Sequence, residues 1–246
     1  MKNLIKRVAR RVFGISGKKV PANHSRLTTH KFVPDANQKF LWIQQLEIKT
    51  VLDIGAHEGK TAIQFLSLFP DANIHSFEPI PECYSKLVEK TKNEKRCKTY
   101  NLAIGETGGT IEFHQSSYSP SSSILPMAKA HEEAFPFTEG GKKVSVNVTS
   151  LDSFASQNTF ETPLAMKIDV QGYEWQVLKG AINTLKNTKL ILIETSFVEL
   201  YKDQKLFSSI YEMLIQQGFV YVGSFDQLFN PNNGKPIQQD AIFIRN

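Results

Sequence analysis

VLDIGAHEGKTAIQFL, residues 51–66, changes its hydrophobic pattern part-way along. A short apolar run ends at Asp53, Gly55 follows almost at once, and Gly59 comes four residues later. From there, apolar side chains at positions 62, 65, 66 and 69 have the spacing of one face of a helix. The stretch therefore predicts a strand, a glycine-containing turn and a helix, with a carboxylate near the end of the strand.

The same alternation of short apolar strands and amphipathic helices continues along the chain. Strands are expected at residues 50–54, 73–77, 98–103, 164–168, 189–194, 219–223 and 240–244. Helices are expected at residues 36–46, 60–69, 81–92, 173–186 and 204–217. This order predicts an α/β fold whose mostly parallel sheet is covered by helices on both faces. A turn at NPNNGKP, without a helix, joins the last two strands, so an antiparallel last strand is expected.

Residues 105–149 interrupt this rhythm as an inserted loop. They contain strand-like pieces at 110–114 and 143–148, with the sequence SSYSPSSSILPM between them. A chain of 246 residues is long enough for one large domain and short for two. We expect a single domain over residues 35–246.

Charge divides the chain at residue 34. Residues 1–34 hold nine Lys and Arg and no acidic residue, whereas the remainder holds 20 basic and 24 acidic side chains. A basic arm therefore precedes a mildly acidic body, and the arm's charge is no sign that the body binds nucleic acid. Within residues 1–14 the apolar side chains would share one helix face opposite Lys and Arg, as in a helix lying on a membrane surface. A frayed terminus or a helix packed on its own domain would explain the same pattern.

Cysteine usage and hydropathy indicate a cytoplasmic protein. Cys83 and Cys97 give neither a disulfide framework nor the spacing of a zinc site, and we expect reduced thiols in the core. No apolar run approaches the roughly 20 residues that a transmembrane helix needs. No paired His or Cys ligands suggest a metal site. If the arm does bind membrane, the protein would lie at the inner surface of the cytoplasmic membrane.

Five polar residues stand at or near the ends of five expected parallel strands. They are Asp53, Glu78, Asn101, Asp169 and Glu194. Any one of them can be explained as a cap of the following helix. In open parallel sheets, however, ligands bind beyond the carboxyl ends of the strands, where the strand order reverses. Taken together, the five residues predict a ligand site there.

The glycine turn indicates which ligand this site takes. Asp53-Ile-Gly55-Ala-His-Glu-Gly59 lacks the third glycine of the G-x-G-x-x-G dinucleotide pattern, which disfavours a nicotinamide enzyme. A carboxylate at the turn would repel a pyrophosphate and would suit an ammonium or sulfonium group. Glu78, 25 residues after Asp53, fits an acid that accepts hydrogen bonds from ribose hydroxyls. A ribose with a cationic tail suggests S-adenosylmethionine.

Several motifs together resemble a known family. They are VLDIGAHEG, the SFEP around Glu78, NLAIG at 101–105, the serines of 121–123 and KIDVQGYEWQVLKGA at 167–181. In this combination the chain resembles the FkbM-type methyltransferases from about residue 50 to about residue 196. The resemblance implies a seven-stranded Rossmann-like class I fold that transfers methyl from S-adenosylmethionine to an oxygen of a sugar, polyketide or similar metabolite. Gln171 stands where a glutamate is common in that family.

The resemblance also implies roles for individual residues at the cofactor. Residues along its methionine part would be Asp53, Gly55, His57 and Gly59. Glu78 would bind the ribose, and the adenine end would meet Asn101, Ala103 and Ile104. His57 has an equally good alternative role as a cap of the helix that follows it.

A hydroxyl acceptor must lose a proton during methyl transfer, so a positioned base is expected. Asp169 is the first candidate, His57 the second and Glu194 the third; Asp169 could equally orient the acceptor or hold the cofactor amine. Ser121, Ser122 and Ser123 would bind a small-molecule or carbohydrate acceptor, unless they belong to a mobile surface loop. The alternative function is a nucleic-acid-binding protein or RNA methyltransferase that uses the basic arm, although the acidic body lacks basic–aromatic interleaving.

Overall fold

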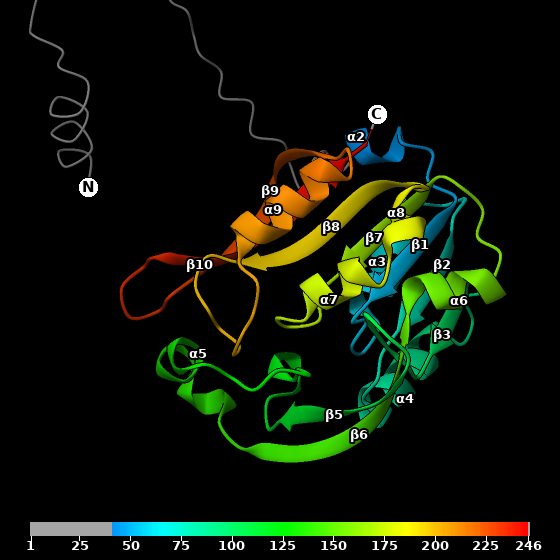
Figure 1. Cartoon of the computed structure of the whole chain (residues 1–246). Helices are drawn as coiled ribbons and strands as arrows, with labels where there is room; N and C mark the ends of the chain where they lie inside the picture. Colours follow the sequence, from blue (N-terminus) through cyan, green and yellow to red (C-terminus); the bar gives the residue numbers. More distant parts are fainter. Residues whose placement is uncertain (1–40, 246) are drawn as a thin grey trace, which may run out of the picture. The chain divides into compact units, whose positions relative to one another are not determined.

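The computed structural model of the protein describes residues 41–245. Within them a seven-stranded sheet has the order β3-β2-β1-β7-β8-β10-β9 (Figure 1). Its strands are β1 (Thr50–Ile54), β2 (Asn73–Phe77), β3 (Cys97–Tyr100), β7 (Leu164–Ile168), β8 (Thr188–Ser196), β9 (Val220–Phe229) and β10 (Pro236–Ile244). All neighbouring pairs from β3 to β8 are parallel, and β10 runs antiparallel to β8 and β9. The predicted Rossmann-like fold, with its antiparallel last strand, is confirmed.

Helices cover both faces of this sheet because its strands are apolar on both sides. Leu52 of β1 belongs to the core beneath α6, α7, α8 and α9, whereas its neighbour Val51 belongs to the core beneath α2 and α3. The helices are α2 (Leu41–Gln44), α3 (Lys60–Leu68), α4 (Pro81–Thr91), α6 (Leu151–Gln157), α7 (Glu174–Lys179), α8 (Ile182–Leu185) and α9 (Phe207–Gln216).

A second sheet, of three strands in the order β4-β6-β5, was not predicted. β4 (Ala103–Gly105) pairs in parallel with β6 (Gly141–Ser150), and β5 (Gly109–Ser116) pairs with β6 antiparallel, forming an arch apart from the main sheet (Figure 1). The alternating pattern of 110–114 and 143–148 indicated two strands, but not their partners. Between them lie η2 (Ser119–Ser121), α5 (Lys129–Ala134) and η3 (Pro136–Thr138), so the segment predicted as an inserted loop is largely structured.

Two predicted elements are divided in the structure. The strand expected at 98–103 ends at Tyr100, and residues 103–105 join the second sheet instead. The helix expected at 173–186 is interrupted at Gly180, where an added Cβ would lie 2.0 Å from the carbonyl oxygen of Gly105. Backbone from the second sheet therefore passes too close to residue 180 for any side chain, and glycine is required there.

Some expectations concern residues outside the described part of the chain. The basic arm of residues 1–34, the membrane-surface helix of residues 1–14 and the start of the helix at 36–46 all lie there. Within residues 41–245, no helix has the length and apolar character needed to cross a membrane. Both cysteines are described and unpaired: Cys83 is buried and Cys97 is half-buried.

Candidate active site

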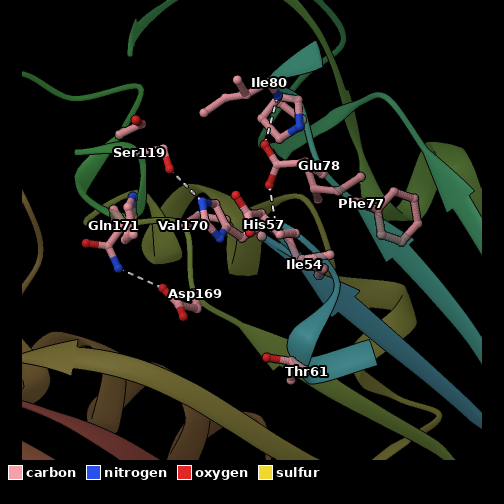
Figure 2. Close-up of a pocket in the computed structure, with 18 of the residues that line it drawn as sticks. Ile54, His57, Thr61, Phe77, Glu78, Ile80, Ser119, Asp169, Val170 and Gln171 are labelled. Atoms are coloured by element: carbon pink, nitrogen blue, oxygen red, sulfur yellow. Dashed lines mark hydrogen bonds between the residues drawn. The ribbon is translucent and has the colours of Figure 1, made fainter. Parts of the chain in front are cut away.

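A cavity of about 370 Å³ lies at the carboxyl ends of β1, β2 and β7 (Figure 2). The strand order turns back between β1 and β7, which is where open α/β sheets bind ligands. The turn after β1 forms one side of the cavity, and η2 of the serine-rich segment contributes to another. Its volume falls in the range of roughly 300–1,000 Å³ that small-molecule sites occupy.

The turn after β1 is held against its neighbours by the backbone. The N–H groups of Gly55 and Ala56 both donate to the carbonyl of Phe77, at 3.1 and 3.0 Å. Gly55 has a φ of 83°, and a Cβ there would lie 1.8 Å from the carbonyl oxygen of Asp169. Only glycine fits this backbone contact between β1 and β7. Gly55 lines the cavity, whereas Gly59 does not; it precedes α3 with a φ of 80°.

Glu78 follows β2 directly and lines the cavity. Its two carboxylate oxygens accept the backbone N–H groups of His57 and Ile80, each at 2.8 Å (Figure 2). Burial raises the pKa of this carboxyl to about 7, in spite of the two donors. The carboxylate is thus held rigidly at the cavity wall, where the sequence predicts the ribose.

Asp53 and Asn101 lie behind this wall and do not line the cavity. Asp53 is fully buried; one oxygen accepts the hydroxyl of Ser76 at 3.2 Å and the other has no hydrogen-bond partner. Burial raises the pKa of Asp53, against the opposing effect of Lys167. The Asn101 amide donates to the carbonyls of Glu78 and Pro79, at 2.9 and 3.0 Å. Asn101 thus supports the turn that carries Glu78, and Asp53 links β1 to β2.

Lys167, Asp169 and Glu194 form a charged cluster at the opposite side of the cavity. Lys167 Nζ lies 2.9 Å from Asp169 Oδ2. Burial alone would raise the pKa of Asp169, but the adjacent ammonium outweighs it and holds that pKa below its usual value. The pKa of Glu194 is raised well above its usual value by burial and by the negative charge of Asp169. Asp169 is therefore the more acidic member of the pair, and Glu194 keeps its proton to higher pH.

Lys167 was not predicted as a site residue, although it lies in β7 two residues before Asp169, which directly follows that strand. Side chains two apart on a strand point to the same face, so this alternation was the available signal. Of the three predicted serines, Ser122 lines the cavity, and Ser121 and Ser123 do not. All three are buried. The hydroxyl of Ser119, which no prediction included, lies 2.9 Å from His57 Nε2 (Figure 2).

The remaining wall is apolar. Ala103 and Ile104 line it as predicted, and Phe77, Leu102 and Phe113 contribute as well. Glu78 directly follows Phe77 of this wall. The cavity therefore offers an apolar surface for a flat ring beside a carboxyl group for a hydroxylated sugar.

Residues 53–221 match the family model of the methyltransferase FkbM domain. The chain belongs to this family. It is 31% identical over 170 residues to the 2-O-methyltransferase NoeI of Sinorhizobium fredii, an alignment covering 67% of this chain and 70% of that protein. It is 25% identical over 189 residues to the hexuronic acid methyltransferase AglP of Haloferax volcanii, covering 73% of each.

The chain also resembles solved structures at low sequence identity. The putative rRNA-methylase from Clostridium thermocellum has a TM-score of 0.44 and 11% identity, covering 85% of this chain and 93% of that one. The fold of this FkbM methyltransferase is established by its own strand order.

S-adenosylmethionine is the cofactor of this FkbM methyltransferase, and the cavity suits it chemically. Glu78 offers carboxylate oxygens to ribose hydroxyls, and the wall at Ile104 offers apolar surface to an adenine. The opposite side carries the Asp169 carboxylate, paired with the Lys167 ammonium at 2.9 Å. Within residues 41–245, no group of three or more His, Cys, Asp or Glu is arranged to hold a metal ion.

Proposed function

We propose that this methyltransferase methylates a hydroxyl oxygen of a carbohydrate or similar small polyol, with Asp169 as the base. The observation that carries the proposal is an ionised carboxylate, fixed by Lys167 at 2.9 Å, at the wall of the cofactor cavity. Two relatives support the acceptor class, since one is named a 2-O-methyltransferase and the other a hexuronic acid methyltransferase.

For the cofactor, we propose that Glu78 binds the ribose and that Ala103 and Ile104 contact the adenine. Gly55 and His57 would flank the methionine part. Asp53, Gly59 and Asn101 would act from behind the wall, by holding the backbone turns in place. We assign direct contact only to predicted residues that line the cavity, and a supporting role to those that do not.

Bound S-adenosylmethionine supplies a methyl group on a positively charged sulfur, a strong electrophile. The protein must hold the acceptor hydroxyl in line with that bond, and orientation of this kind can lower a barrier by up to roughly 7–11 kcal/mol. As the oxygen gains its methyl group its proton becomes strongly acidic. A weak base such as Asp169 can therefore accept it, provided that it lies within hydrogen-bond reach.

His57 is the second candidate for the base. Burial lowers the pKa of His57, so the imidazole is neutral near pH 7 and one ring nitrogen can accept a proton. Its Nε2 is already engaged with the hydroxyl of Ser119, which would place the acceptor beside η2. Glu194 ranks third because its raised pKa lets it hold a proton to higher pH than Asp169 does. Ser119 and Ser122 are the serines that we propose contact the acceptor.

Asp169→Asn, His57→Gln and the surface control Asp226→Asn separate these candidates. The assay follows transfer of a labelled methyl group to a panel of hexose and hexuronic acid glycosides, while calorimetry follows S-adenosylhomocysteine binding. If Asp169 is the base, Asp169→Asn lowers single-turnover transfer by roughly 100-fold or more and leaves cofactor affinity within a few-fold. A normal rate in Asp169→Asn with a large loss in His57→Gln would assign the base to His57. No label in any glycoside would reject the acceptor class.

We also infer a cytoplasmic location, with residues 1–14 contacting a membrane surface. The support is the amphipathic, basic composition of the arm in the sequence.

A further inference from the structure

The side chain of Gln171 lies between the carboxyl groups of Asp169, the candidate base, and Glu194. Its Nε2 donates to Asp169 Oδ1 at 2.8 Å (Figure 2) and to Glu194 Oε2 at 2.7 Å. Asp169 follows β7 and Glu194 lies in β8, so one amide group bridges the ends of two neighbouring strands. A primary amide has two N–H donors, and both are used here.

Tyr201 fixes the orientation of this amide. Its hydroxyl, on a fully buried ring, donates to Gln171 Oε1 at 2.9 Å. A flipped amide would direct its oxygen at the ionised Asp169 carboxylate, which cannot donate a hydrogen bond. Asp169 therefore favours the orientation described here.

Gln171 and Tyr201 also contact the serine segment, residues 116–127. Ser123 Oγ donates to the backbone carbonyl of Gln171 at 2.6 Å, and the Tyr201 hydroxyl is 3.2 Å from the carbonyl of Ser121. Gln171 has a φ of 54°, and the Glu174 carboxyl accepts the N–H groups on either side of it, from Val170 and Gly172. The unusual backbone conformation is thus supported from both sides.

We propose that Gln171 is a positioning residue that joins Asp169 and Glu194 into one hydrogen-bonded unit and ties that unit, through Tyr201, to the serine segment beside the acceptor. This inference deepens the proposed function and rests on the role of Asp169 as base. A glutamate at this position would offer at most one donor and would add a third carboxyl group. The neutral amide adds no charge beside the two carboxyl groups and the Lys167 ammonium.

Other ionisable groups surround the pair from every side. Those acting on Asp169 or Glu194 are Lys167 of β7, Asp53 of β1, Glu174 of α7 and Asp240 of β10, with His57 and Tyr201 from the loops. None of the substitutions below alters these groups, except the Tyr201 change, which removes a hydroxyl that donates to Gln171. A change in the titration of the pair would therefore report on the Gln171 bridge.

The test is a ¹³C-carboxyl NMR titration of Asp169 and Glu194 in the full-length protein, without cofactor or acceptor. Gln171→Met keeps the size of the side chain and removes both donors. Because the amide stabilises the ionised carboxylates, both titration midpoints should rise, that of Asp169 by about one pH unit. Tyr201→Phe, which frees the amide to turn, should move them in the same direction by less. If Gln171→Met folds poorly, the Tyr201→Phe variant still tests whether the amide affects the titration of the two carboxyl groups.

Gln239→Met is the matched control, because Gln239 also accepts a tyrosine hydroxyl, that of Tyr221 at 3.2 Å. Its titration should match that of the unmodified protein. Midpoints of Asp169 and Glu194 that stay unchanged in Gln171→Met would overturn the inference. That result would leave the methyltransferase proposal standing, since no turnover is measured.

A kinetic readout completes the test once an acceptor is known. Gln171→Met should lower kcat and move the acidic limb of the pH–rate profile upward, with unchanged cofactor affinity. Loss of cofactor affinity alone, with an unchanged profile, would contradict the positioning role.

Discussion

At the scale of single residues, the site depends on carboxyl groups whose ionisation is set by burial. Glu78 is the clearest case, because it is 4% exposed and yet lines the cavity. Two backbone N–H groups keep its oxygens in place, but they do not restore the usual pKa. A ligand that donates hydroxyls to this carboxyl would favour the charged form.

This predicts a pH-dependent cofactor affinity. Ribose hydroxyls bind the ionised carboxylate more strongly, so S-adenosylhomocysteine should bind more tightly as pH rises through about 7. Glu78→Ala should weaken binding by about 1.5–3 kcal/mol at pH 8 and remove this dependence. The thermal midpoint should also fall, because the N–H groups of His57 and Ile80 lose their acceptor.

Calorimetric titration at pH 6 and pH 8 measures the effect. Glu82→Ala, at an exposed position at the start of α4, is the control and should bind as the unmodified protein does. Unchanged affinity in Glu78→Ala would remove Glu78 from the cofactor site.

At the scale of elements, the turn between β7 and α7 carries much of the site. It contains Asp169 and Gln171, and it closes on Glu174, the first residue of α7. Glu174 accepts two backbone N–H groups of the turn, at 3.1 and 3.0 Å. Gly172 leaves room for the Tyr201 ring, which lies 2.9 Å from where a Cβ would be. One short turn thus brings the candidate base, its bridging amide and their support together.

The protonation of Glu174 links this turn to the pH dependence of stability. Burial raises its pKa in the folded protein to about 7, from an ordinary value of 4.5. A raised carboxyl pKa means that the folded state binds the proton more tightly than the unfolded state does. The contribution of Glu174 to the free energy of unfolding is therefore complete below about pH 4.5 and is lost as pH rises through about 7. Glu174→Gln keeps an acceptor oxygen and removes the titration. It should flatten the decline between pH 5 and 8 by roughly 1–3 kcal/mol.

Urea unfolding at several pH values checks this expectation. The control is Glu132→Gln, at an exposed position in α5. Because Glu78 and Asp240 also have raised pKa values, a decline should persist in Glu174→Gln with a smaller slope. An identical slope in the variant would show that Glu174 is not protonated at the lower pH.

At the scale of the whole molecule, the described domain and the basic arm differ in charge and have separate expected roles. Every residue that we propose for the cofactor lies between Asp53 and Ile104, well after the arm. Residues 1–34 hold nine of the 29 Lys and Arg. Opposite charges on lipids would attract this segment without involving the acidic body.

Deleting residues 1–18 should therefore leave S-adenosylhomocysteine binding and the thermal midpoint of the domain unchanged. If the arm binds membrane, the intact protein should sediment with anionic liposomes, and the truncated protein should not. Raising the salt concentration should weaken the association, because screening reduces attraction between surface charges. Neutral liposomes are the control. An intact protein that stays in the supernatant with anionic liposomes would reject membrane contact.

The sequence by itself determined the main sheet. Short apolar strands alternate with helices of period 3.6, and this pattern is local, so five strands and the glycine turn could be placed to within a few residues. The polar residues at strand ends were also visible, because parallel strands bring their carboxyl ends to one edge. Glu78, Asp169 and Glu194 were found at the cavity for this reason.

Tertiary structure alone decided which side chains meet. The second sheet pairs Ala103 of β4 with Val148 of β6, far along the chain, and no local period encodes that partner. Tyr201 reaches Gln171 across 30 residues, and His57 reaches Ser119 across 62. Asp53 and Asn101 share the pattern of the cavity residues, yet the pleat and the turns direct them into the supporting layer. Sequence periodicity determines which face of a strand or helix a residue occupies. The residues that it contacts depend on which distant segments lie next to it in the folded protein.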